Sequence, residues 1–237
     1  MNKVLIAAAL MGIAQPAFAA DEGSKVFGEV GVGAGFSKTD LQFNNPTGAP
    51  FTSNTTTGGY INLTNKDDSD SSFVGYAVLG YNLTPNVNVH ASYQYLGSTK
   101  ASGGAVFSGT TFAQNYEGKA QGLFVGIGGN FDLTPSIFAE VNGDVGVGFI
   151  KASGTQGTRG IFPSASHSNF AWGVGGGLGY RVGKGVSLIG KVNYHDLGNA
   201  NTAISGPNAN SLGMNTDERL ETKLKTVTTT LGLRFNF

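Results

Sequence analysis

The chain has 237 residues, with 15 Lys and Arg against 15 Asp and Glu, 38 glycines and no cysteine. The balanced charge excludes the strongly basic surface of a nucleic-acid-binding protein, and without cysteine there are no disulfides and no cysteine-ligated metal. Glycine is about twice as frequent as in an average protein, and it falls inside the apolar segments as well as between them.

The first 19 residues are typical of a secretory signal peptide. Lys3 is followed by an apolar run at 4–13 and by the small residues Ala17 and Ala19. The run is shorter than the roughly 20 apolar residues that a membrane-spanning helix needs. We therefore expect residues 1–19 to be a signal peptide and residues 20–237 to form one exported domain.

After residue 20, charged and amide side chains interrupt every stretch that might otherwise form a membrane helix, but eight segments alternate apolar and polar side chains. They lie at 25–37, 70–82, 87–98, 118–131, 136–151, 167–182, 186–197 and 223–237. Each reaches the length of roughly 10 residues that a tilted β-strand needs to cross a bilayer. Because only helices and closed barrels pair all their backbone groups inside lipid, the pattern predicts an all-β fold, an eight-stranded antiparallel up-and-down transmembrane β-barrel.

The connections between these segments alternate in length. Three are short turns, at 83–86, 133–136 and 182–185, and the long ones at about 38–69, 99–117, 152–166 and 198–222 are rich in Ser, Thr, Asn and Gly. Residues 80–89 are echoed by residues 129–138, so the repeated unit is a hairpin. Short periplasmic turns and long extracellular loops are typical of bacterial outer-membrane barrels, and we assign residues 20–237 to such a domain.

The aromatic side chains of the apolar face are expected to form two girdles, one at each membrane surface. The nine positions are Tyr81, Phe131 and Tyr180 near the short turns, and Phe36, Tyr93, Tyr95, Phe149, Trp172 and Tyr194 near the long loops. A soluble sandwich, the alternative for an all-strand sequence, gives no reason for aromatic residues to separate by height.

The opposite face is polar and is expected to fill the inside of the barrel. Its charged members are Glu29, Glu140, Asp144, Arg181, Lys191 and Arg234. Eight strands leave an interior just wide enough for side chains, so we expect one charge network there instead of a continuous channel. Glu29 on the first strand should meet Arg234 on the last, and Lys191 should compete for Glu140 or Glu29.

The hairpin Gly80-Tyr81-Asn82-Leu83-Thr84-Pro85-Asn86 and the aromatic end at Phe237 make the chain resemble the OmpA-like eight-stranded outer-membrane β-barrel proteins, including the opacity and attachment-type surface proteins. The resemblance implies a place in the outer membrane of a Gram-negative bacterium. It also implies that Phe235 and Phe237 form the signal read by the barrel-assembly machinery.

Function stays open between two classes. The first is a structural and adhesion-like surface role, in which long loops bearing Phe43, Phe51, Tyr60, Phe107, Phe112 and Tyr116 meet a host or matrix ligand. The second is a narrow porin or a transport barrel for small hydrophobic molecules.

An enzyme acting on lipid A is a further alternative, because His167 and His195 are expected at the barrel rim near Ser164 and Ser166. Ser168 follows His167 directly, however, which puts these two side chains on opposite faces of the strand. We expect no catalytic residues, no cofactor and no metal site. The expected partners are outer-membrane lipid, the assembly machinery and an external surface ligand, with no nucleic acid, and the expected state is a monomer.

Overall fold

The computed structural model describes residues 25–45, 59–62, 64–67, 69–107, 110–156, 160–203 and 219–237. The expected signal peptide at 1–19 lies outside the described residues. Among the residues that are described, no helix has both the length and the apolar character needed to cross a membrane.

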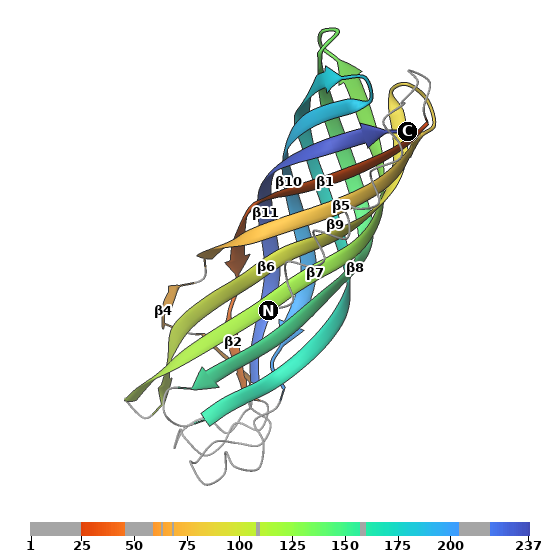
Figure 1. The fold of residues 1–237 in the computed structure, drawn as a ribbon. Helices are drawn as coiled ribbons and strands as arrows, with labels where there is room; N and C mark the ends of the chain where they lie inside the picture. The colour runs from red at the N-terminus through yellow and green to blue at the C-terminus, as the bar shows by residue number, and fades with distance from the viewer. Residues whose placement is uncertain are drawn as a thin grey trace, which may run out of the picture.

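Eight long antiparallel strands form a closed ring (Figure 1). They are β1 (Val26–Thr39), β5 (Ser69–Asn82), β6 (Val87–Phe107), β7 (Thr110–Asp132), β8 (Ile137–Gln156), β9 (Gly160–Gly183), β10 (Val186–Asn201) and β11 (Arg219–Asn236). Three short strands, β2 (Gln42–Asn45), β3 (Gly59–Asn62) and β4 (Thr64–Asp67), pair outside this ring. Each long strand pairs with the next along the chain, and β11 pairs with β1. The predicted eight-stranded up-and-down barrel is confirmed.

The repeated hairpin folds in the same way at both places. In the first turn Val87 N donates to Thr84 Oγ1 at 3.0 Å, and in the second Ile137 N donates to Thr134 Oγ1 at 3.0 Å. A threonine hydroxyl that accepts from the backbone three residues later favours a tight turn over strand continuation. These turns mark the periplasmic end of the barrel.

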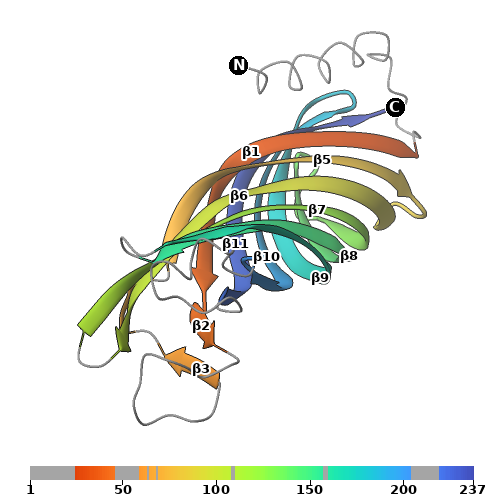
Figure 2. The same cartoon turned by 90° about the horizontal axis from the view of Figure 1, so that it is seen from below.

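At the extracellular end the strands are longer than predicted. The segments 99–117 and 152–166, expected as loops, are mostly strand, because β6 runs to Phe107 and β7 starts at Thr110, while β8 runs to Gln156 and β9 starts at Gly160. Figure 2 shows the β6–β7 hairpin projecting past the ring. Outside the membrane both faces of a strand can be polar, so a Ser, Thr and Gly composition did not exclude a strand there.

In this extended half the ring divides into two sheets. The β5–β6 ladder ends at Gly75 and Tyr95, and the β9–β10 ladder ends at Trp172 and Asp196. A glycine with positive φ follows each end, Gly97 at 84° on β6 and Gly198 at 77° on β10. Beyond these bulges β6 to β9 form one sheet, while β10, β11, β1 and β5 form the other.

Side chains close the two seams between the sheets. Asn169 Nδ2 donates to the carbonyls of Leu197 at 3.2 Å and Asn199 at 2.5 Å, and Asp70 Oδ2 accepts from Lys100 N at 2.9 Å. These side-chain hydrogen bonds take the place of backbone ladder bonds beyond the ends of the two ladders.

An apolar cluster fills the space between the two sheets, and we call it the apolar plug. Its members are Leu41, Leu96, Ala101, Tyr116, Ala120, Phe124, Ile150, Ala152, Phe162, Ala171, Leu197, Ala200, Leu220 and Leu224. The plug corrects the expectation that polar groups fill the whole interior. It also corrects the placement of Tyr116, which was expected to face outward from a loop but is only 2% exposed. The side chains of Phe43, Phe51, Tyr60, Phe107 and Phe112 lie outside the described part of the chain.

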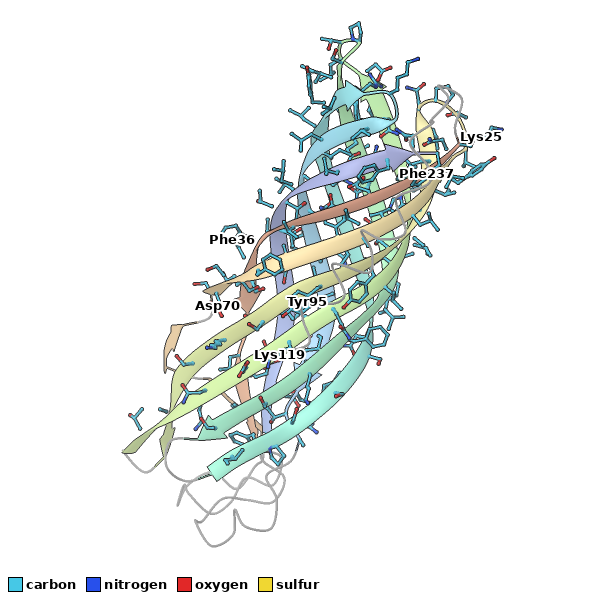
Figure 3. The ribbon with its side chains drawn as sticks, in the orientation of Figure 1. Lys25, Phe36, Asp70, Tyr95, Lys119 and Phe237 are labelled. Carbon is cyan, nitrogen blue, oxygen red and sulfur yellow. The ribbon has the colours of Figure 1, made fainter. Side chains whose placement is uncertain are left out.

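The outer surface carries an apolar band that includes Val32, Leu79, Val125, Ile127 and Leu231, all more than half exposed. Of the nine girdle positions, Phe36, Tyr81, Tyr93, Phe131, Trp172 and Tyr180 are exposed, and Tyr95, Phe149 and Tyr194 are half-buried (Figure 3). Exposed apolar side chains in a continuous band suit a lipid environment. The girdle role of the nine aromatic residues stays a prediction.

Candidate functional site

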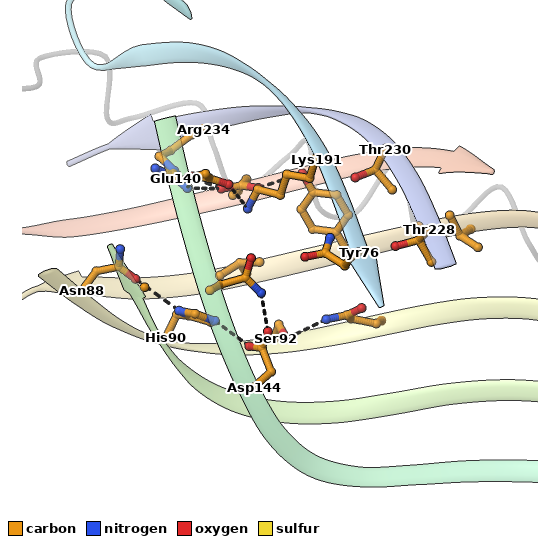
Figure 4. A pocket seen from close by; sticks show the side chains of 18 of the residues that line it. Tyr76, Asn88, His90, Ser92, Glu140, Asp144, Lys191, Thr228, Thr230 and Arg234 are labelled. Atoms are coloured by element: carbon orange, nitrogen blue, oxygen red, sulfur yellow. Dashed lines mark hydrogen bonds and ion pairs between the residues drawn. The ribbon is translucent and has the colours of Figure 1, made fainter. Parts of the chain in front are cut away.

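A polar chamber lies inside the ring on the periplasmic side of the apolar plug. Its lining includes Glu29, Tyr76, His90, Asp144 and Lys191, and its cavity measures about 50 Å³ (Figure 4). A buried water occupies roughly 10–15 Å³ on this scale, so the chamber has room for about three to five waters. It is too small to be a continuous wide channel.

Four charged side chains meet in the chamber, and we call them the four-charge cluster: Glu29, Glu140, Lys191 and Arg234. Arg234 Nη2 lies 2.7 Å from Glu29 Oε2 and 2.5 Å from Glu140 Oε2. Lys191 Nζ lies 2.5 Å from Glu29 Oε1 and 2.7 Å from Glu140 Oε1. Two cations thus bridge two carboxylates, and the cluster is neutral.

The strand register explains how the cluster forms. Glu29 of β1 stands directly opposite Arg234 of β11 in the ladder that closes the ring. Lys191 reaches in from β10 and Glu140 from β8, across the barrel. The cluster therefore links β1 and β11, which close the ring, to β8 on the opposite side of the barrel. Glu29 is only 1% exposed.

Aromatic rings complete the surroundings of these charges. Tyr76 donates its hydroxyl to Glu29 Oε1 at 2.7 Å, and Lys191 Nζ lies 5.5 Å from the centre of the Tyr76 ring. The Arg234 guanidinium lies 4.7 Å from the ring centre of Phe27 and 5.7 Å from that of Phe138. Cations over ring faces are further stabilised where water is excluded.

Asp144 belongs to a second polar cluster, which corrects the expectation of one network. Its Oδ1 lies 2.7 Å from His90 Nε2, and its Oδ2 accepts from Asn142 Nδ2 at 2.5 Å. The other His90 nitrogen lies 3.2 Å from Asn88 Oδ1. Strand alternation puts His90 and Asn88 on the inner face of β6, but it does not show that they meet Asp144 of β8.

Arg181 is the second correction, because it lies at the periplasmic mouth and not in the four-charge cluster. Its Nη2 lies 2.5 Å from Asp132 Oδ1, and its Nη1 donates to the Pro135 carbonyl at 3.0 Å. Its side chain is 40% exposed, and its guanidinium lies 5.0 Å above the Phe138 ring. Arg181 lies two residues before the end of β9, so it is closer to the periplasmic end of the barrel than the four-charge cluster is.

Buried apolar side chains lie at both ends of the chamber. Phe27 and Phe138, 2% and 4% exposed, lie on its periplasmic side, and the apolar plug lies on its extracellular side. Each ring occupies the space in front of a glycine: a Cβ on Gly80 would come 2.1 Å from Phe27, and a Cβ on Gly179 would come 2.1 Å from Phe138. These glycines let bulky rings fit inside a narrow barrel.

Of the two histidines expected at the rim, His195 lies inside the barrel against the apolar plug, which corrects its expected place. His195 is fully buried, with its ring centre 5.5 Å from that of Phe124, and among the described residues neither of its nitrogens has a hydrogen-bond partner. His167 Nε2 lies 2.6 Å from the Asn201 carbonyl oxygen. Asp196 accepts from Gly198 N and pairs with Lys223 at 3.3 Å, so these contacts do not assemble a Ser-His-acid triad.

The two terminal aromatic residues lie at the periplasmic end of β11. Phe237 is 41% exposed, and its backbone N–H donates to the Val26 carbonyl at 2.9 Å. Phe235 is half-buried and stands opposite Gly28 in the closing ladder. Their role as an assembly signal stays a prediction.

Comparison with solved structures finds two outer-membrane proteins with TM-scores above 0.5, and a weaker match to a third. OprG of Pseudomonas aeruginosa aligns with a TM-score of 0.55 at 11% identity, covering 90% of this chain and 98% of that chain. The outer membrane protease OmpT of Escherichia coli gives 0.51 at 9% identity, covering 90% and 97%. The attachment invasion locus protein Ail of Yersinia pestis gives 0.36 at 14% identity, covering 88% and 99%.

At these identities the likeness concerns the fold alone. A search of curated protein sequences finds no match. The family model described as "Outer membrane protein beta-barrel domain" matches residues 5–237. The chain therefore belongs to this family of bacterial outer-membrane β-barrel proteins.

Proposed function

We propose that the protein is a closed surface barrel that binds an external ligand through its extended extracellular sheets, with an adhesion-like role. The observation that carries this proposal is that buried apolar side chains lie at both ends of the polar interior. The apolar plug fills the extracellular half, and the rings of Phe27 and Phe138 close the periplasmic side of the chamber. A barrel closed in this way is a scaffold, so its activity lies on its surface.

The extended half offers a suitable binding surface. The sheet of β6 to β9 continues past the membrane-spanning ring and is backed by the apolar plug, which holds it in one shape. Its outer face mixes polar groups such as Asn115 and Thr155 with an apolar side chain, Ile161, which is 72% exposed. A rigid surface loses little conformational entropy on binding, which favours affinity.

The second function class, a narrow porin or a carrier of small hydrophobic molecules, requires a path through the plug. The tightly paired four-charge cluster and a chamber of about 50 Å³ argue against such a path. We also propose that the protein acts as a monomer without enzymatic activity, and that Phe235 and Phe237 are read by the barrel-assembly machinery.

We expect two results that together test this proposal. In planar bilayers the folded protein should show no steady conductance, because the interior is closed twice. On the cell surface it should support attachment to immobilised matrix proteins or host cells, compared with cells carrying an empty vector. A variant in which residues 103–114 and 155–161 are replaced by two-residue Asn-Gly turns should lose this attachment.

The trimmed variant keeps the plug residues Ala101, Tyr116, Ala152 and Phe162, so it should still fold. A difference in gel migration between heated and unheated samples checks that the barrel is intact. Steady conductance by the folded protein, or attachment that is unchanged in the trimmed variant, would contradict the proposed function.

A further inference from the structure

Two lysines stand directly opposite each other on the outer face of the barrel, Lys119 of β7 and Lys151 of β8. On its other side Lys119 stands opposite Ser98 of β6, and Lys151 stands opposite Ser166 of β9. A single row across four strands therefore reads Ser, Lys, Lys, Ser. Like charges directly opposite each other across a ladder are destabilising, so this arrangement needs a counter-charge to be favourable.

The protein itself supplies little of that counter-charge. Among the described residues Lys151 has no ion pair, and Lys119 has one, with Glu117 Oε1 at 3.5 Å. Both side chains of this pair are well exposed, at 61% and 44%, so the pair is weak. Lys100 stands opposite Glu117 in the register and its backbone N–H donates to Asp70 across the seam, so among the described residues Glu117 is the one carboxylate that contacts the lysine pair.

The row lies at the height of lipid headgroups. Phe149, an outer-girdle position, is two residues below Lys151 on the same face of β8, and Figure 3 shows Lys119 on the extracellular side of Tyr95. From Ile137 at the periplasmic end to Phe149 is 12 residues, which in a strand tilted by about 45° spans roughly 29 Å. That is about the thickness of the hydrocarbon core, so Lys119 and Lys151 come immediately above it.

From these observations we infer that Lys119 and Lys151, flanked by Ser98 and Ser166, bind the phosphate group of an outer-leaflet lipid. Two ammonium groups neutralise a phosphate monoester, and two hydroxyls supply further hydrogen bonds to its oxygens. The acyl chains of the same lipid then lie against the apolar band below. The site is separate from the surface that binds the external ligand.

The other side of the barrel provides a matched control. Lys38 of β1 and Lys225 of β11 also stand directly opposite each other, and both are exposed. The next position in that row is Asp196 of β10, so an acid stands where the first row has a serine. Removing these two lysines changes the net charge by the same amount, about half a turn around the barrel from Lys119.

Quenching of a single tryptophan by brominated lipids tests the inference in the complete folded protein. The chain has one tryptophan, Trp172, so the F149W/W172F background moves the reporter to a position two residues below Lys151. The protein is reconstituted in phosphatidylcholine vesicles that contain brominated phosphatidic acid, which carries a phosphate monoester, or brominated phosphatidylcholine. We expect phosphatidic acid to quench more strongly, with its relative binding constant falling about fivefold for each lysine changed in K119Q and K119Q/K151Q.

The K38Q/K225Q variant should keep the full preference for phosphatidic acid. Added inorganic phosphate should reduce the preference no more than sodium chloride of equal ionic strength, because the lipid is held by its chains as well. The inference is overturned if the two lipids quench equally, or if K38Q/K225Q loses as much of the preference for phosphatidic acid as K119Q/K151Q does. It is also overturned if inorganic phosphate competes specifically. A heated and unheated gel comparison confirms that every variant is folded.

Discussion

Replacing Arg234 with alanine is expected to destabilise the folded barrel by about 3 to 5 kcal/mol, the usual cost of leaving a buried charge unpaired. Arg234 pairs with both Glu29 and Glu140, so its loss leaves two buried carboxylates with Lys191 as their single cation. It also removes a cation from the faces of Phe27 and Phe138. Urea unfolding of the vesicle-reconstituted protein, followed by Trp172 fluorescence, measures the free energy of unfolding.

The matched control is Arg181→Ala, which removes the same side chain from a partly exposed pair with Asp132. Exposed pairs contribute up to about 1 kcal/mol, so this variant should unfold close to the parent. Combining Arg234→Ala with Glu29→Gln leaves Glu140 opposite Lys191, and the balanced charge should recover part of the lost stability. If Arg234→Ala and Arg181→Ala unfold at the same urea concentration, the four-charge cluster does not stabilise the barrel.

The contact between Glu29 and Arg234 could be predicted because it depends on two features visible in the sequence. The first and last strands of a closed barrel must pair, and strict alternation puts both side chains on the inner face. Asp144 shares that face, but it lies four residues beyond Glu140 on β8, roughly 14 Å along the strand. Alternation assigns the face of a side chain but says little about its height, so two clusters were taken for one.

The apolar plug was missed for a different reason. Phe124 and Leu224 lie within the predicted strands and have inner-face parity, but that face was expected to be polar along its whole length. Other plug residues, such as Tyr116 and Phe162, lie in segments that were treated as loops. Leu96 and Leu197 keep the inner-face parity, but the bulges at Gly97 and Gly198 then shift the alternation, which brings Ala101 and Ala200 inside. The position of a bulge depends on how two sheets separate in space, and no local pattern of side chains determines it.

Replacing Gly179 with alanine should also destabilise the barrel, by about 1 to 3 kcal/mol, because it overfills a closely packed interior. The new Cβ would come 2.1 Å from Cζ of Phe138, and the ring is held between the guanidinium groups of Arg181 and Arg234. The ring therefore has to shift, and the cations packed against it have to shift as well. The same urea titration in vesicles measures the loss.

Gly190→Ala is the control, since a Cβ at that glycine of β10 would have no neighbour within 4 Å. Changing Phe138 to leucine as well should relieve the overlap, so the double variant should lose less stability than the two single changes together. Such coupling is expected only for residues in contact. Equal stability of the Gly179→Ala and Gly190→Ala variants would mean that the Phe138 ring is not fixed in front of Gly179. The periplasmic closure of the chamber, on which the proposed non-conducting role depends, would then be in doubt as well.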